Sequence, residues 1–357
     1  MRAAAQRLTS VRAKEHRPAA ILQQTFGLQA QVLSAAALGL RVRSTGLHVR
    51  DVNRALVDDR SIVRTWLMRG TLHLVAADDI RWLVQLLGPV FARAGARRHT
   101  QLGLDDDLKT RGVAGIRRIL ADSGPLTRDE LVDRLGGRGI RLDPKTQGPI
   151  HLIAFAAMQA VLCLGPERDD GESTYVLLDD WVPPARTPTR EAALAELARR
   201  YFAAYGPATL DDLGAWSGIA MAEARLGVVG AKSSLADVTI QRQPGFVIKD
   251  RLTQATAPAT PQARLLPAFD TYLLGYRRRD LAVAPALQRR LQRGGGWLHP
   301  AVVVDGRAVA AWSLRKSGGR GRLQVERISR AIRAGVEAEA ADIGRFLDLP
   351  VTLEIAR

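Results

Sequence analysis

Cysteine is nearly absent from this sequence of 357 residues: the single one, Cys163, lies in the apolar run 160–164. One cysteine cannot form an intramolecular disulfide or a thiolate metal site, and its apolar neighbours predict a buried thiol. Long apolar stretches are absent too, and the basic N-terminus is not followed by the apolar run of a secretory signal. These absences predict a soluble intracellular protein with no membrane segment.

The usual signatures of metal-dependent and nucleotide-dependent enzymes are also missing. None of the six histidines lies in a His-Glu-x-x-His motif or in another cluster with metal-ligand spacing. The glycine-rich stretches 136–139 and 294–296 match neither a Walker nor a Rossmann fingerprint. No Ser/His/Asp set is evident, although its members need not lie close in sequence. We therefore expect no metal and no organic cofactor.

Acidic residues are scarce relative to basic ones, with 36 Asp and Glu against 52 Lys and Arg, a formal net charge of +16. The excess is spread along the chain rather than confined to a tail. Such a balance is typical of proteins that bind nucleic acid, although a genome-wide bias toward arginine gives the same composition. With 46% hydrophobic residues, a chain of this length can bury several cores and is expected to form two to four modules.

Three successive stretches have the pattern of winged helices. In residues 1–108, helical runs flank residues 27–31, and a short helix, two hairpin strands and a longer helix are predicted at 52–57, 62–68, 71–75 and 77–91. Gly124-Pro125-Leu126-Thr127 recurs as Gly206-Pro207-Ala208-Thr209, each with a threonine placed to cap a short acidic helix between two others. This helix-turn-helix order predicts winged helices at 109–182 and 183–237.

The character of the sequence changes near residue 238. Short apolar runs follow, with Asp305-Gly306 as a hairpin turn, and they predict strands at 245–248, 264–266, 301–304, 308–314 and 323–325. A helix at 328–348 and a strand at 351–355 complete the chain. The sequence therefore predicts an α+β protein whose residues 238–357 form a C-terminal β domain with a terminal helix.

Gln29 and Gln31 are polar where the surrounding pattern is apolar, and they follow Gly27, which can end a helix. In a continuous helix, residues two apart point about 200° apart, whereas in an extended segment they share a face. Two amides that act together therefore predict an elbow between two helices. Ordinary glutamines on a helix surface are the alternative interpretation.

Three blocks of the sequence, in order, resemble the AlkZ-like winged-helix DNA glycosylases: residues 27–31, 64–73 and 265–277. The order of the blocks and the chain length agree over nearly the whole sequence. The resemblance implies tandem winged-helix domains followed by a C-terminal β-barrel-like domain, and an activity that repairs interstrand crosslinks and other alkyl lesions on DNA. It also implies that Gln29 and Gln31 are the catalytic pair.

The chemistry of such lesions suits a pair of neutral amides. N7-alkylated guanine is already cationic and needs no strong acid to leave, so the enzyme must stabilise the sugar cation and hold a water. We expect a monofunctional glycosylase in which Gln29 stabilises the sugar oxocarbenium and Gln31 positions the water. Its expected partner is double-stranded DNA carrying alkyl lesions, bound by a monomer at the nucleoid in the cytoplasm. General repair and self-resistance of an antibiotic producer both fit.

Candidate DNA contacts come from three stretches. Arg69, Thr71 and His73 belong to the second resembling block, and Arg277 belongs to the third. Four cations surround a glycine tip that suits the DNA backbone or minor groove: Arg315, Lys316, Arg320 and Arg322. The alternatives are a structural hydrogen bond for His73 and solvated cations elsewhere, while Asp270 is either catalytic or a buried carboxylate that orders its own loop.

A winged-helix transcription regulator that binds operator DNA without catalysis is the alternative function. It predicts sequence-specific binding and no release of bases. The Gln-x-Gln elbow favours the glycosylase, because a regulator has no need of two amides at a bend.

Overall fold

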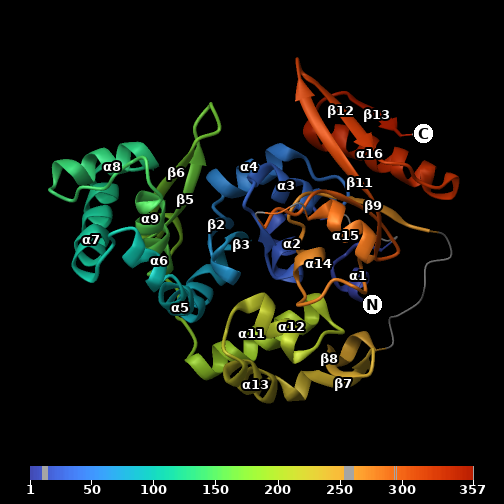
Figure 1. The fold of residues 1–357 in the computed structure, drawn as a ribbon, viewed down its shortest axis with the longest axis horizontal. Helices are drawn as coiled ribbons and strands as arrows, with labels where there is room; N and C mark the ends of the chain where they lie inside the picture. The colour runs from blue at the N-terminus through green and yellow to red at the C-terminus, as the bar shows by residue number, and fades with distance from the viewer. Residues whose placement is uncertain (10–14, 253–260, 293, 295, 357) are drawn as a thin grey trace.

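The computed structural model describes residues 1–9, 15–252, 261–292, 294 and 296–356 (Figure 1). The first repeating unit follows the short helix α1 (Arg2–Ala5). It consists of two helices separated by a very short strand, a third helix, an antiparallel hairpin and a long helix, in the order α2 (Pro18–Thr25), β1 (Leu28–Gln29), α3 (Leu33–Arg41), α4 (Val49–Val57), β2 (Ile62–Trp66), β3 (Leu72–Ala76) and α5 (Ala77–Ala94). Helix α6 (Ala96–Gln101) leads to the next unit.

A similar order of elements occurs twice more, although the third unit has only an isolated bridge at Ala208 in place of the short strand. The second unit contains α7 (Asp106–Ser123), β4 (Leu126–Thr127), α8 (Arg128–Gly137), α9 (Gly148–Met158), β5 (Leu162–Glu167) and β6 (Ser173–Leu177). After α10 (Leu178–Trp181), the third contains α11 (Arg190–Tyr205), α12 (Leu210–Ser217), α13 (Met221–Gly230), β7 (Leu235–Ile240) and β8 (Gln243–Ile248). The predicted boundary at residue 237 falls inside β7, because the third unit includes the β7–β8 hairpin, which pairs with Ala208 through Phe246.

The predicted threonine caps are confirmed. The Thr127 hydroxyl accepts from the backbone of Glu130, whose carboxylate accepts from the backbone of Thr127. Thr209 and Asp212 make the same reciprocal pair at the start of α12. Such a pair satisfies backbone donors that a helix start leaves open, which is why both helices begin where the sequence places them.

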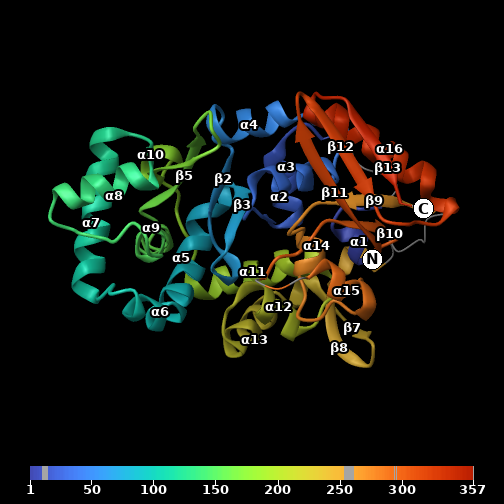
Figure 2. The same cartoon turned by 45° about the horizontal axis from the view of Figure 1, so that its top comes forward.

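The first two units share one sheet. Its strand order is β1-β3-β2-β5-β6-β4, and β2 and β5 meet at Arg64 and Leu164. Figures 1 and 2 place the second unit at one end of the molecule and the C-terminal sheet at the other, with the first unit between them. The buried thiol of Cys163 lies in this sheet, as predicted.

The C-terminal sheet is open, and the barrel that the resemblance implied is not found. Its order is β13-β12-β11-β10-β9, and within the described residues the two edge strands do not pair with each other. The strands are β9 (Ala263–Leu266), β10 (Ala301–Val304), β11 (Arg307–Ser317), β12 (Arg320–Val325) and β13 (Val351–Ile355). Helix α16 (Arg333–Leu347) packs against the sheet, and the buried Val336 and Phe346 join its core. The helix thus covers apolar surface that a closed barrel would enclose.

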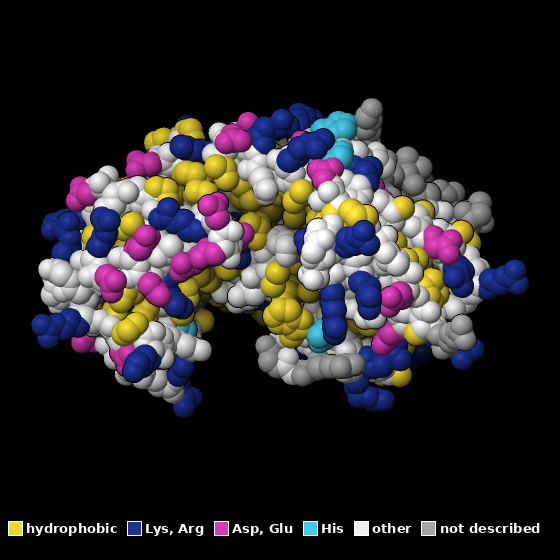
Figure 3. Space-filling model, turned by 90° about the horizontal axis from the view of Figure 1, so that it is seen from above, with side chains coloured by type: hydrophobic (Ala, Val, Ile, Leu, Met, Phe, Trp, Pro, Cys, Tyr) yellow, Lys and Arg dark blue, Asp and Glu magenta, His cyan; other side chains and the backbone are white. Residues whose placement is uncertain are grey.

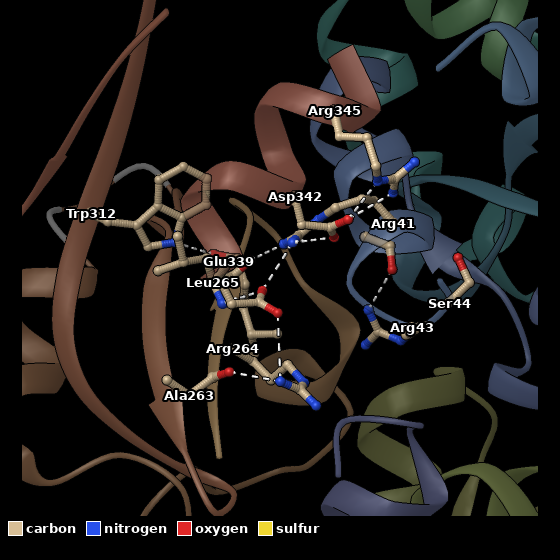
Figure 4. A network of polar contacts seen from close by, with 12 residues as sticks. Arg41, Arg43, Ser44, Ala263, Arg264, Leu265, Trp312, Glu339, Asp342 and Arg345 are labelled. Carbon is tan, nitrogen blue, oxygen red and sulfur yellow. Dashed lines mark hydrogen bonds and ion pairs between the residues drawn. The ribbon is translucent and has the colours of Figure 1, made fainter. Parts of the chain in front are cut away.

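Ion pairs connect the C-terminal region to the first unit, and Figure 4 shows the one that Arg41 makes with α16. Arg41 of α3 donates to Glu339 at 3.0 Å and to Asp342 at 3.1 Å on α16. Arg43 donates to both oxygens of Asp270, each at 2.8 Å, and neither side chain is exposed. Asp270 also accepts from the backbone of Tyr272 at the start of α14 (Thr271–Leu274), so it orders its own loop.

No helix among the described residues is long and apolar enough to span a bilayer.

Candidate functional site

The predicted elbow between two helices is confirmed. Helix α2 ends at Thr25, and both Phe26 (φ 55°) and Gly27 (φ 85°) are left-handed. The chain then runs extended as β1, paired with β3, before α3 begins at Leu33. A Cβ at position 27 would lie 3.3 Å from the carbonyl oxygen of Leu74, so both the backbone angle and the space favour glycine here.

Gln29 lies in this extended segment, and Gln31 lies at the bend between it and α3. Leu28 and Ala30 both belong to the core that the first unit shares with the C-terminal sheet. Since side chains alternate along extended chain, Gln29 faces away from that core. Gln29 is only 8% exposed, whereas Gln31 is open to solvent. The elbow therefore presents one enclosed amide and one accessible amide.

Arg69 holds the enclosed amide. One guanidinium nitrogen of Arg69 lies 2.5 Å from Oε1 of Gln29, and the other donates to the carbonyl oxygen of Trp216 at 3.3 Å. Arg69 has φ 58° in the short turn η1 (Met68–Gly70) between β2 and β3. Burial lowers the pKa of this guanidinium from its ordinary value. The arginine expected as a DNA contact thus lies in the protein, bonded to the candidate catalytic glutamine.

His73 sits directly beside Gln29 in the sheet, with Thr65 on its other side. Its Nδ1 lies 2.9 Å from the carbonyl oxygen of Thr71, so Nδ1 carries the proton and donates. Complete burial, reinforced by the charge of Arg69, lowers the pKa of His73 to about 3. His73 is therefore neutral at physiological pH, and its Nε2 is an acceptor closed off from solvent without a partner in the described chain.

The buried neutral state of His73 predicts that acid weakens the fold. Between pH 6.5 and 3, the unfolded chain binds a proton at this residue and the folded chain does not, so stability falls as the pH drops through that window. From pH 7 to pH 5 this loss is about 2 kcal/mol. Urea unfolding of the wild type and of His73→Asn at both pH values measures it. Asparagine keeps a donor near Nδ1 but does not titrate, so equal pH dependence in the two proteins would contradict the prediction.

The remaining expected DNA contacts make other interactions in the protein or are exposed. Thr71 bonds through its hydroxyl to the carbonyl oxygen of Met68 within the same turn, at 3.1 Å. Arg277 pairs with Asp211 at the start of α12. The four cations of the β11–β12 hairpin are exposed, with Arg315 opposite Arg322 and Lys316 opposite Gly321. This hairpin projects from the edge of the molecule in Figure 1. Arg69 and His73 are thus brought to Gln29, whereas Arg277 and the hairpin belong to other elements.

Sequence reasoning gave no role to Arg64, although it opens the second resembling block. Its guanidinium crosses to the elbow and donates to the carbonyl oxygens of Ala30 at 3.0 Å and Gln31 at 3.4 Å. It also pairs with Glu167 of β5 at 3.2 Å. Arg64 therefore ties the backbone that carries both glutamines to the second unit. Its position in the block, one strand from the predicted hairpin tip, was the only signal in the sequence.

No group of three or more His, Cys, Asp or Glu side chains in the described part of the chain is arranged to hold a metal ion.

Comparisons with known proteins find similar chains both by sequence and by structure. A family model described as DNA glycosylase AlkZ-like matches residues 22–346. An interstrand DNA cross-link repair glycosylase from Streptomyces sahachiroi is 33% identical over 315 residues, which cover 82% of this chain and 81% of the relative. The solved structure of the DNA glycosylase AlkZ from the same organism superposes with a TM-score of 0.82 and 28% identity, over 99% of this chain and 97% of the other.

Proposed function

The chain belongs to the AlkZ-like DNA glycosylase family, and from this premise we propose that it hydrolyses the N-glycosidic bond of N7-alkylated guanine in double-stranded DNA. Bulky adducts and interstrand crosslinks are included, because the relative from Streptomyces sahachiroi is named for cross-link repair. The observation that supports the proposal is the elbow, where Gln29 lies in β1 and the exposed Gln31 follows two residues later.

The groups around the elbow suit a bond that alkylation has already weakened. When C1′–N9 breaks, its electron pair neutralises the cationic base, and the sugar becomes an oxocarbenium ion. A water oxygen then bonds to C1′ and releases a proton to solvent. His73 cannot protonate the base at neutral pH, because its pKa is about 3. Two amides can stabilise the sugar cation and position the water without acid catalysis, which restricts the enzyme to activated leaving groups.

We propose that the three repeating units are winged helices, the third extending to the end of β8, and that the duplex does not dock on the second. Residues 106–181 contain thirteen Asp and Glu against ten Lys and Arg, in a chain that is otherwise strongly basic. In Figure 3 acidic side chains are frequent over this end of the molecule, and a notch separates it from the opposite end. Electrostatics therefore favours a duplex held by the first unit and the β11–β12 hairpin.

Removing charge from the hairpin is expected to weaken duplex binding. The double variant Lys316→Gln, Arg320→Gln should lower the slope of log affinity against log salt by about 2 and the affinity at 150 mM salt by about tenfold. The matched control removes two exposed cations from the acidic second unit, Arg128→Gln with Lys145→Gln, and should bind like the wild type. Fluorescence anisotropy with a labelled duplex at several salt concentrations measures both. Equal losses in the two double variants would contradict the docking proposal.

The proposed activity is tested by incubating the purified protein with duplex carrying one N7-methylguanine and cleaving abasic sites with alkali. Strand cleavage at the lesion, and none in undamaged duplex, supports the proposal. A second duplex with a defined N7–N7 crosslink tests the wider substrate range. Tight binding without cleavage on either substrate would overturn the proposed function.

A further inference from the structure

The contact with Arg69 determines which end of the Gln29 amide faces the protein. A guanidinium has five donor hydrogens and no acceptor. The amide atom 2.5 Å from it must therefore be the carbonyl oxygen, and not the nitrogen. The oxygen of Gln29 is thus already bonded to a partly buried positive charge before any substrate arrives.

The nitrogen of the same amide remains available. It has no hydrogen-bond partner among the described residues, and it is not one of the polar side-chain atoms that are closed off from solvent. The 8% of Gln29 that stays exposed therefore includes its NH₂ group. Gln31 differs, since the side chain is exposed and, within the described part of the chain, neither end of its amide is bonded.

We infer that Arg69 is a positioning residue that makes Gln29 the hydrogen-bond donor of the catalytic pair and leaves Gln31 as the acceptor. A water between the amides would accept from the Gln29 NH₂ and donate to the Gln31 carbonyl. Its second lone pair then points to C1′, and the proton lost on bond formation passes to solvent. The inference rests on the proposed glycosylase function and deepens it.

This assignment changes the roles expected from the sequence, in which Gln29 stabilised the sugar cation. A carbonyl oxygen bonded to a guanidinium has lost much of its capacity to attract a second positive charge. The oxygen of Gln31 has no such partner among the described residues, so it is the one that can face both the water and the oxocarbenium.

The protein around Arg69 keeps it in this position. Its second bond goes to the carbonyl oxygen of Trp216, whose ring packs 5.3 Å from Phe26 and 5.1 Å from Tyr201. The left-handed turn at Arg69 and the following Gly70 fix where the side chain leaves the hairpin. Because Phe26 also ends α2 just before the elbow, one aromatic cluster positions both the guanidinium and the segment that carries the amides.

A pair of isosteric variants tests the division of roles. A carboxylate has acceptors and no donor, so Gln29→Glu removes the proposed function of Gln29, whereas Gln31→Glu keeps an acceptor. With N7-methylguanine duplex under single-turnover conditions, Gln29→Glu should lose about 100-fold in rate and Gln31→Glu no more than about tenfold. Equal losses, or a greater loss for Gln31→Glu, would overturn the inference. A wild type that releases no base would instead overturn the proposed function itself.

Variants of Arg69 test the positioning role separately. Arg69→Met removes the donor and should lower kcat about tenfold with KM unchanged, whereas Arg69→Lys restores a donor and should recover most of the rate. Both substitutions place a non-glycine side chain at the same left-handed position, so they carry the same backbone cost. Thermal melting confirms that both variants are folded. A raised KM with an unchanged kcat in Arg69→Met, or no recovery by Arg69→Lys, would overturn the inference.

Discussion

Replacing Gln31 by alanine is expected to lower base release by about 10³-fold while duplex binding and stability stay at wild-type levels. The side chain is exposed and has no hydrogen-bond partner in the described chain, so its removal should change the free energy of unfolding by less than about 0.5 kcal/mol. The loss of rate should therefore arise in the chemical step, and not from unfolding or from weaker binding. Single-turnover assays with N7-methylguanine duplex measure the rate, and anisotropy with the same duplex measures binding.

The matched control is Gln23→Ala, in α2 just before the elbow. Gln23 is also exposed, and its amide bonds to Asp78 at the surface at 3.3 Å. Its removal changes the protein surface near the elbow but leaves the residues of the elbow unchanged. The rate of base release should therefore stay near that of the wild type. If Gln31→Ala released base as fast as Gln23→Ala, the accessible amide would have no catalytic role and the proposed mechanism would fail.

The features that sequence predicted well are those determined within a few residues. Thr127 and Thr209 cap their helices through partners three positions later. The elbow includes Gly27, whose left-handed backbone follows the left-handed Phe26 at the end of α2. The hairpin turn at Asp305-Gly306 likewise joins β10 and β11. In each case the residues that determine the feature are close in sequence, so the local pattern alone contains the information.

The features that sequence could not supply depend on residues far apart along the chain. Arg69 and Gln29 are 40 positions apart, and Arg64 and Ala30 are 34 apart; both contacts arise only once β1, β3 and β2 align in register. An arginine beside a glycine turn has the same local signature whether its side chain points to solvent or inward. The open C-terminal sheet is similar, because the strands were predicted but closure depends on where α16 packs.

Truncating Asp270 to alanine is expected to destabilise the protein by about 3–5 kcal/mol, the cost of leaving the buried Arg43 guanidinium without its partner. The two ion pairs that Asp348 makes with His48 and Arg50 lie at the surface, so Asp348→Ala should cost less than about 1 kcal/mol and serves as the control. Urea unfolding measures both.

Asp270→Ala also separates the two roles that the sequence allowed for Asp270. If the carboxylate were catalytic, the variant would be folded and inactive. If the carboxylate is structural, the variant unfolds at a lower urea concentration but still releases the alkylated base at low temperature, where it remains folded. Because both oxygens of Asp270 are bonded to Arg43 and one also accepts from the backbone of Tyr272, we expect the second outcome.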